Sequence, residues 1–100
     1  MKFSCEKALL QAAIATTSWA VSAKSAIPTL EGLLLEASDH VKMTGYNLET
    51  GISTILPADV AEPGKIVLNA KILNDIIRFF PDDVVTIVVS ETLTALIMCG

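Results

Sequence analysis

The first residues of the chain alternate between apolar and polar side chains, and the pattern then changes to helical spacing. Alternation with period two predicts a strand over Lys2–Glu6, and spacings of three and four positions predict a helix from Glu6 or Lys7 to Ser22. The apolar strand positions are Phe3 and Cys5, and the helix stripe is Leu9, Leu10, Ala13, Ile14 and Thr17.

The same pattern returns 63 positions further along the chain, from Leu9 to Ile72. It predicts a strand over Lys65–Asn69 and a helix over Ala70–Phe80, which ends at Pro81 because proline disrupts helical geometry. The strand positions are Ile66 and Leu68, and the helix stripe is Ile72, Leu73, Ile76, Ile77 and Phe80. A repeat of this size indicates two copies of one supersecondary unit.

Three strand-like runs follow the first helix. They cover Leu30–Ala37, Val41–Tyr46 and Glu49–Leu56. Ser38-Asp39-His40 and Tyr46-Asn47-Leu48 are candidates for tight turns, so these runs predict a three-stranded meander. Pro57–Gly64 is expected to be a linker, because Pro63-Gly64 is a turn signal.

Only two strand-like runs follow the second helix. After a turn at Asp82-Asp83 they cover Val84–Ser90 and Thr92–Cys99. The chain therefore predicts one α+β domain over residues 1–100, with two βαβββ units and two helices packed on antiparallel sheet. Unit one spans 1–56, and unit two, at 65–100, lacks its last strand. We expect Thr92–Cys99 to present an open hydrogen-bonding edge.

Composition narrows the classes of function. The net charge is −4 and the sequence pI is about 4.7, which argues against a strong autonomous DNA-binding domain. Apolar residues make up 52% and charged residues 18% of the chain, so self-association is expected. The chain has no apolar run long enough to span a bilayer and no signal-like N-terminus, which predicts a soluble, cytoplasmic protein.

Residues that could carry catalysis are few. His40 lies in a predicted turn, where a solvated side chain is the simpler interpretation, and Asp82-Asp83 follows a helix-ending proline, where such residues usually form a turn. Cys5 and Cys99 have no neighbours with metal-ligand spacing and are expected to be small buried apolar residues. The sequence predicts no enzyme, no metal site and no cofactor.

Four segments occur in an order that resembles the N-terminal domain of the bacterial sliding clamp, the DNA polymerase III β subunit. They are Met1-Lys2-Phe3-Ser4; Ile27-Pro28-Thr29-Leu30 with Gly32 and Leu33-Leu34-Leu35; Thr44-Gly45-Tyr46-Asn47-Leu48-Glu49; and Pro63-Gly64-Lys65-Ile66-Val67-Leu68. The resemblance covers essentially all 100 residues. In that family each domain is a pair of βαβββ units, three domains form a subunit, and two subunits close a ring around DNA.

The resemblance implies a non-catalytic processivity factor for DNA replication, an accessory subunit of a DNA-directed DNA polymerase. Double-stranded DNA is the implied partner, contacted through its backbone, whereas polymerase and clamp loader bind through domains absent here. Matching positions imply backbone contacts by Lys24, Lys71 and Arg78, with Lys7 as a weaker candidate. Each of these four residues has an alternative role as a solvated surface cation.

Some positions depart from the family. The outer face of the first helix is neutral, and Trp19 and Phe79 lie off the core stripes. Each aromatic is either a peripheral core residue or part of a contact surface. Together with apolar side chains on both faces of the last strands, they predict a homo-oligomer. The expected self-association residues are Trp19, Phe79, Leu93, Leu96, Ile97 and Met98.

Two other functions remain open from the sequence. The chain could be an engineered or self-assembling scaffold that keeps the clamp-like fold without a role in DNA replication. It could also be a small enzyme or ligand-binding domain, which would require a deep polar pocket with convergent titratable groups.

Overall fold

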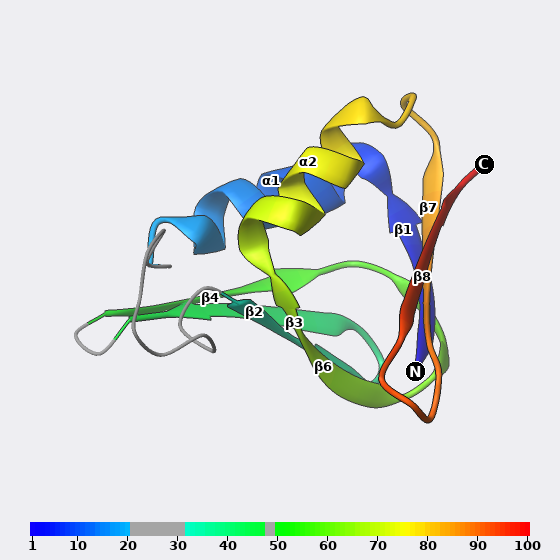
Figure 1. The fold of residues 1–100 in the computed structure, drawn as a ribbon, viewed down its shortest axis with the longest axis horizontal. Helices are drawn as coiled ribbons and strands as arrows, with labels where there is room; N and C mark the ends of the chain where they lie inside the picture. The colour runs from blue at the N-terminus through cyan, green and yellow to red at the C-terminus, as the bar shows by residue number, and fades with distance from the viewer. Residues whose placement is uncertain (21–31, 48–49) are drawn as a thin grey trace.

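The computed structural model describes residues 1–20, 32–47 and 50–100 (Figure 1). The order of its elements is β1 (Lys2–Glu6), α1 (Lys7–Ser18), β2 (Gly32–Ala37), β3 (Val41–Tyr46), β4 (Gly51–Leu56), β5 (Asp59–Glu62), β6 (Gly64–Asn69), α2 (Ala70–Phe79), β7 (Val84–Val89) and β8 (Ala95–Cys99). The predicted α+β class with two helices on antiparallel sheet is confirmed.

The strands form two four-stranded sheets, in the orders β5-β1-β7-β8 and β4-β3-β2-β6. Every pairing is antiparallel. The two repeat units are interlocked, because β1 of the first unit pairs with β7 and β6 of the second unit pairs with β2. Each unit therefore gives its first strand to the sheet that the other unit builds.

The prediction of a linker over Pro57–Gly64 is wrong. Residues 59–62 form β5, which pairs with β1, and the chain continues through Pro63 into β6, which pairs with β2 in the other sheet. Gly64 is at this crossing, where a Cβ would lie 2.9 Å from the Cβ of Met1. Pro63-Gly64 suggested a turn, but an edge strand such as β5 can end at a proline.

The bounds of α1 and β8 also differ from the predictions. Helix α1 ends at Ser18, four residues before the expected end, and the Ala20 N–H donates to the Thr17 carbonyl at 3.2 Å in a tighter final turn. Strand β8 starts at Ala95 instead of Thr92, because residues 90–94 form the hairpin: the Ser90 N–H donates to the Thr94 carbonyl at 3.0 Å.

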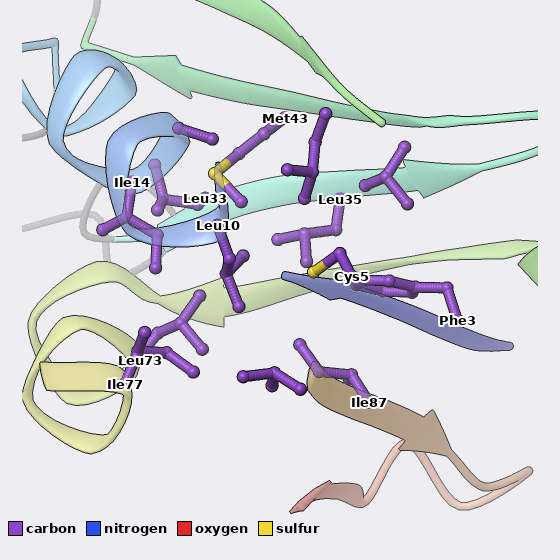
Figure 2. Close-up of a cluster of buried hydrophobic side chains, with 14 of the residues drawn as sticks. Phe3, Cys5, Leu10, Ile14, Leu33, Leu35, Met43, Leu73, Ile77 and Ile87 are labelled. Atoms are coloured by element: carbon purple, nitrogen blue, oxygen red, sulfur yellow. The ribbon is translucent and has the colours of Figure 1, made fainter. Parts of the chain in front are cut away.

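Helices α1 and α2 lie together on the inner side of the two sheets (Figure 1). The core fills the space between them, and its largest side chains come from both units. Figure 2 shows Leu10 and Ile14 of α1 and Leu73 and Ile77 of α2 directed towards the strands. All four are at most 1% exposed.

Part of the predicted apolar stripe of α2 is on the surface. Ile72 and Ile76 were predicted to face the core, but Ile72 is 60% and Ile76 37% exposed. Only Ala70, Leu73 and Ile77 of this helix are buried. The core therefore occupies a narrower face of α2 than the apolar pattern implies.

Candidate nucleic-acid interface

Helix α2 positions two of the predicted DNA-contact residues. Its first turn is fixed by Asn69, whose side-chain oxygen accepts a hydrogen bond from the Ile72 N–H at 3.0 Å. Leu73 and Ile77 hold the helix against the core, which leaves Lys71 and Arg78 exposed on its outer side. Within the described residues, no hydrogen bond or ion pair holds the Lys71 ammonium, so it is free to meet an anion.

Arg78 is partly engaged by its own helix. Its Nη2 lies 4.0 Å from the Asp75 Oδ1, and its Cζ lies 5.1 Å from the centre of the Phe79 ring. The ion pair is exposed, so it is weak and screened by salt. The guanidinium can therefore exchange Asp75 for another anion at little cost.

Lys7 has a different environment from the other two cations. Its Nζ donates to the carbonyl oxygen of Phe80 at 2.6 Å, and its backbone N–H donates to the carbonyl of Asp83 at 3.0 Å. A cation at a helix C-terminus also interacts favourably with the helix dipole. Lys7 therefore joins the start of α1 to the end of α2, and its ammonium group is engaged by a carbonyl of the same domain.

The outer face of α1 carries no charge. Its exposed residues there are Ala8, Ala12, Ala15, Thr16 and Trp19, and Trp19 is 85% exposed. Lys24, the fourth predicted contact, lies outside the described residues. The helix pair thus offers two exposed cations, both on α2, for a nucleic-acid backbone.

The predicted self-association residues lie on different elements. Phe79 is 78% exposed on α2, whereas Leu93, Leu96 and Met98 are exposed on the β7–β8 hairpin and the outer face of β8. Ile97 is half-buried, because its side chain packs against the core. Sequence reasoning placed Ile72 and Ile76 on the core stripe, whereas both are exposed and share a side of α2 with Phe79 at the spacing i, i+4, i+7.

Other chemistry has little support in the described residues. No group of three or more His, Cys, Asp or Glu side chains there could hold a metal ion. No helix in this part of the chain is long and apolar enough to cross a membrane. The thiol of Cys5 is buried, and burial raises its pKa from 9.0 to about 11, so it stays protonated at neutral pH.

Comparison with known proteins decides the family. The profile of the DNA polymerase III beta subunit, N-terminal domain, matches residues 1–100. The chain belongs to this family. It is 36% identical to the beta sliding clamp of Synechocystis over 92 residues, covering 89% of this chain and 24% of that protein. It is 30% identical to the beta sliding clamp of Bacillus subtilis, covering 100% of this chain and 29% of that protein.

Solved structures of the family share the fold. A DNA polymerase III beta subunit of Eubacterium rectale, described as putative, superposes with a TM-score of 0.97 at 35% identity, covering 100% of this chain and 28% of that one. The Bacillus subtilis clamp gives a TM-score of 0.95 at 30% identity, with coverage of 100% and 29%. The chain thus spans about a quarter of the length of its relatives. These matches support the sliding-clamp interpretation and give no support to an engineered scaffold.

Proposed function

We propose that this chain is the N-terminal domain of a sliding clamp, which works as part of a homo-oligomeric ring around duplex DNA and keeps a replicative polymerase on its template. The observation that carries the proposal is the match of all 100 residues to the family's N-terminal domain. The fold supports it, because both helices lie together on one side of the sheets (Figure 1) and Lys71 and Arg78 are exposed on α2.

The domain contributes to DNA binding through charge alone. Lys71 and Arg78 meet phosphate oxygens without reading bases, which suits a protein that must slide over any sequence. The neutral face of α1 adds no attraction of its own. Lys24 remains a predicted third contact, whereas we assign Lys7 to holding the two helices together.

The domain performs no catalysis in this proposal. The ring works in the cytoplasm as an accessory subunit, and the polymerase and the clamp loader bind through regions other than residues 1–100. The chain's own contribution is to supply one segment of the ring and two cations to its inner surface.

The salt dependence of duplex binding tests the DNA contacts. We would measure fluorescence anisotropy of a labelled duplex with this chain as salt is raised from a low concentration. Because each neutralised phosphate contributes about 0.9 to the slope of log K against log salt, Lys71→Ala with Arg78→Ala should flatten the slope by about two. The matched control is Lys42→Ala with Lys65→Ala, which removes two exposed cations from the sheet formed by β4, β3, β2 and β6.

Lys7→Met tests whether Lys7 stabilises the fold and takes no part in DNA binding. It should lower the free energy of unfolding by about 1–2 kcal/mol, since the charged hydrogen bond to Phe80 is lost, and leave the salt slope unchanged. A slope near zero for the unaltered chain would contradict the assigned contacts and favour the scaffold interpretation. An equal effect of the Lys42 and Lys65 pair would show that the attraction is not localised on α2.

A further inference from the structure

Helix α1 lies in the longest stretch of the chain without an acidic residue. The chain has 11 Asp and Glu residues and a net charge of −4, yet none of these residues lies between Glu6 and Glu31. Helix α1, at Lys7–Ser18, is wholly inside this interval. A polyanion that approaches α1 is therefore not repelled by any side chain of the helix itself.

Trp19 directly follows α1 and is highly exposed. Among the large apolar side chains of the described residues it is the most exposed, at 85%. On a helix the nearest neighbours of a side chain are three and four positions earlier, and for Trp19 these are Thr16 and Ala15, which are both short. The indole ring is therefore accessible to a planar ligand.

The packing of the helices brings Trp19 to the same end of the helix pair as Lys71. The start of α1 is joined to the end of α2, because the Lys7 Nζ donates to the Phe80 carbonyl at 2.6 Å. The two helices lie side by side (Figure 1), so α1 ends where α2 begins. Lys71 is exposed in the first turn of α2, and Arg78 follows about 10 Å further along the helix axis. The helix pair thus combines an exposed aromatic ring with two exposed cations.

The end of α1 favours an uncharged ligand group over a phosphate. The last carbonyl groups of a helix carry partial negative charge, and α1 has no basic residue in its last turn to offset it. The indole of Trp19 adds one N–H donor and a large apolar ring. A nucleobase, which is planar and uncharged, therefore suits this position, whereas phosphate groups suit Lys71 and Arg78.

The ring can stack on a base only where the base is unpaired and has a free face. In duplex DNA both faces of each base are covered by its neighbours, and a side chain must unstack them to enter. Aromatic side chains beside cations are the usual combination in proteins that bind single strands without sequence preference. Stacking also adds affinity that salt does not screen, which matters in a chain whose net charge is −4.

We propose that Trp19 is a stacking platform for an unpaired base of a single-stranded nucleic acid, whose backbone contacts Lys71 and Arg78. This inference goes beyond the proposed function, which needs only contacts with a duplex backbone, and it rests on that function for the two cations. The ligand is a single strand of any sequence, since every base has a face on which an indole can stack. Trp19 then has a nucleic-acid ligand in place of the second copy that the sequence predicted.

Trp19 reports its own contact, because it is the single tryptophan of the chain. We would titrate the intact chain at low salt with a single-stranded oligothymidylate of about 12 nucleotides, a length within the usual span of one small binding domain. One control is an abasic strand of the same length, which keeps the phosphates and lacks the bases; the other is a duplex of that length. We expect the thymidylate to quench the indole emission and to bind at least about fivefold more tightly than the abasic strand, and neither control to quench it.

Substitution of Trp19 separates stacking from charge. Followed by anisotropy of a labelled thymidylate, Trp19→Leu should weaken binding about fivefold or more and leave the salt slope unchanged, and Trp19→Phe should retain part of the affinity. Lys71→Ala with Arg78→Ala should instead flatten the slope. Tyr46→Leu is the matched control, because it removes an aromatic ring that is 50% exposed on β3, and it should have no effect.

Four results would overturn the proposal. They are equal affinities for the thymidylate and the abasic strand, unchanged affinity in Trp19→Leu, equal quenching by the duplex, and an emission shift with protein concentration in the absence of nucleic acid. The last result would assign the ring to a second copy. If the duplex keeps its salt slope while Trp19 has no effect, only this inference fails; a slope near zero for both strand and duplex would overturn the DNA contacts of α2 as well.

Discussion

Gly64 is required by a close approach of backbone segments. It lies where β5 passes into β6. A Cβ built on it would be 2.9 Å from the Met1 Cβ, which is closer than non-bonded carbon atoms approach each other. The obstruction is the root of a side chain whose backbone is held in place: the Val89 N–H donates to the Met1 carbonyl at 2.8 Å. Met1 therefore cannot move aside without disturbing the sheet.

We expect Gly64→Ala to lower the free energy of unfolding by about 1–3 kcal/mol, the usual cost of overpacking. Urea unfolding monitored by circular dichroism would measure it. Gly51→Ala is the control, because a Cβ there meets the Tyr46 ring at 3.4 Å, an ordinary contact. Its effect should stay within about 0.5 kcal/mol of zero, as for most surface substitutions. Equal effects at both glycines would contradict the steric argument.

The buried thiol of Cys5 makes stability depend on alkaline pH. Its pKa is about 11 in the folded chain, against 9.0 without burial. Between these values the unfolded chain loses the thiol proton while the folded chain keeps it, so unfolding is favoured as pH rises. Stability from this group is complete below pH 9 and declines towards pH 11.

The comparison of Cys5→Val with the unaltered chain isolates this effect, because other groups titrate equally in both. Urea unfolding at several values of pH should show the unaltered chain losing stability relative to the variant above pH 9, and no relative change below it. A constant difference across the whole range would mean that the thiolate is tolerated in the fold.

At the level of single elements, the two helices start differently. The Asn69 side chain caps α2 by accepting from the Ile72 N–H at 3.0 Å, whereas Glu6 at the corresponding place before α1 makes no side-chain cap. Asn69→Ala should therefore cost about 1 kcal/mol, and Asn69→Ser, which keeps an acceptor, should cost less. Thermal unfolding of both variants would check the order. A loss as large for serine as for alanine would assign the effect to something other than the cap.

The sequence identified most elements because their periodicity comes from burial on one side. Strand β3 has the predicted bounds, Val41–Tyr46, since alternate residues face the core and a tight turn precedes it. Strand β5 was missed because only Val60 among its residues is half-buried, so hydrogen bonds to β1 define it more than side-chain burial does. Pairing with a distant strand leaves no local pattern.

The candidate site was harder to predict than the fold. Lys71 and Arg78 are exposed as expected, but the same kind of residue at position 7 has its Nζ 2.6 Å from the Phe80 carbonyl. Nothing near Lys7 in the sequence reveals a partner 73 residues away. Likewise, Ile72 follows the helical period of a core residue, and only the position of the neighbouring strands shows that it is 60% exposed.

For the whole molecule, the interlocked sheets make the two units depend on each other. Strand β1 has both of its neighbours, β5 and β7, beyond the first unit, and β2 needs β6 to complete its sheet. The shared core contains Leu10 and Ile14 from one unit and Leu73 and Ile77 from the other (Figure 2). The repeat in the sequence therefore does not mark two structures that can separate.

We expect a chain divided between Pro57 and Ala58 to show this dependence. The fragment 1–57 would keep β2, β3 and β4 but lose every partner of β1, and the fragment 58–100 would lose β1 from between β5 and β7. Each fragment alone should give an NMR spectrum without dispersed amide signals, because its apolar core surface has nothing to pack against. An equimolar mixture should regain the dispersed spectrum of the intact chain, since all the pairings then become available. A folded spectrum for 1–57 alone would show that one unit is sufficient for folding. The exchange of first strands between the units would then not be required for either unit to fold.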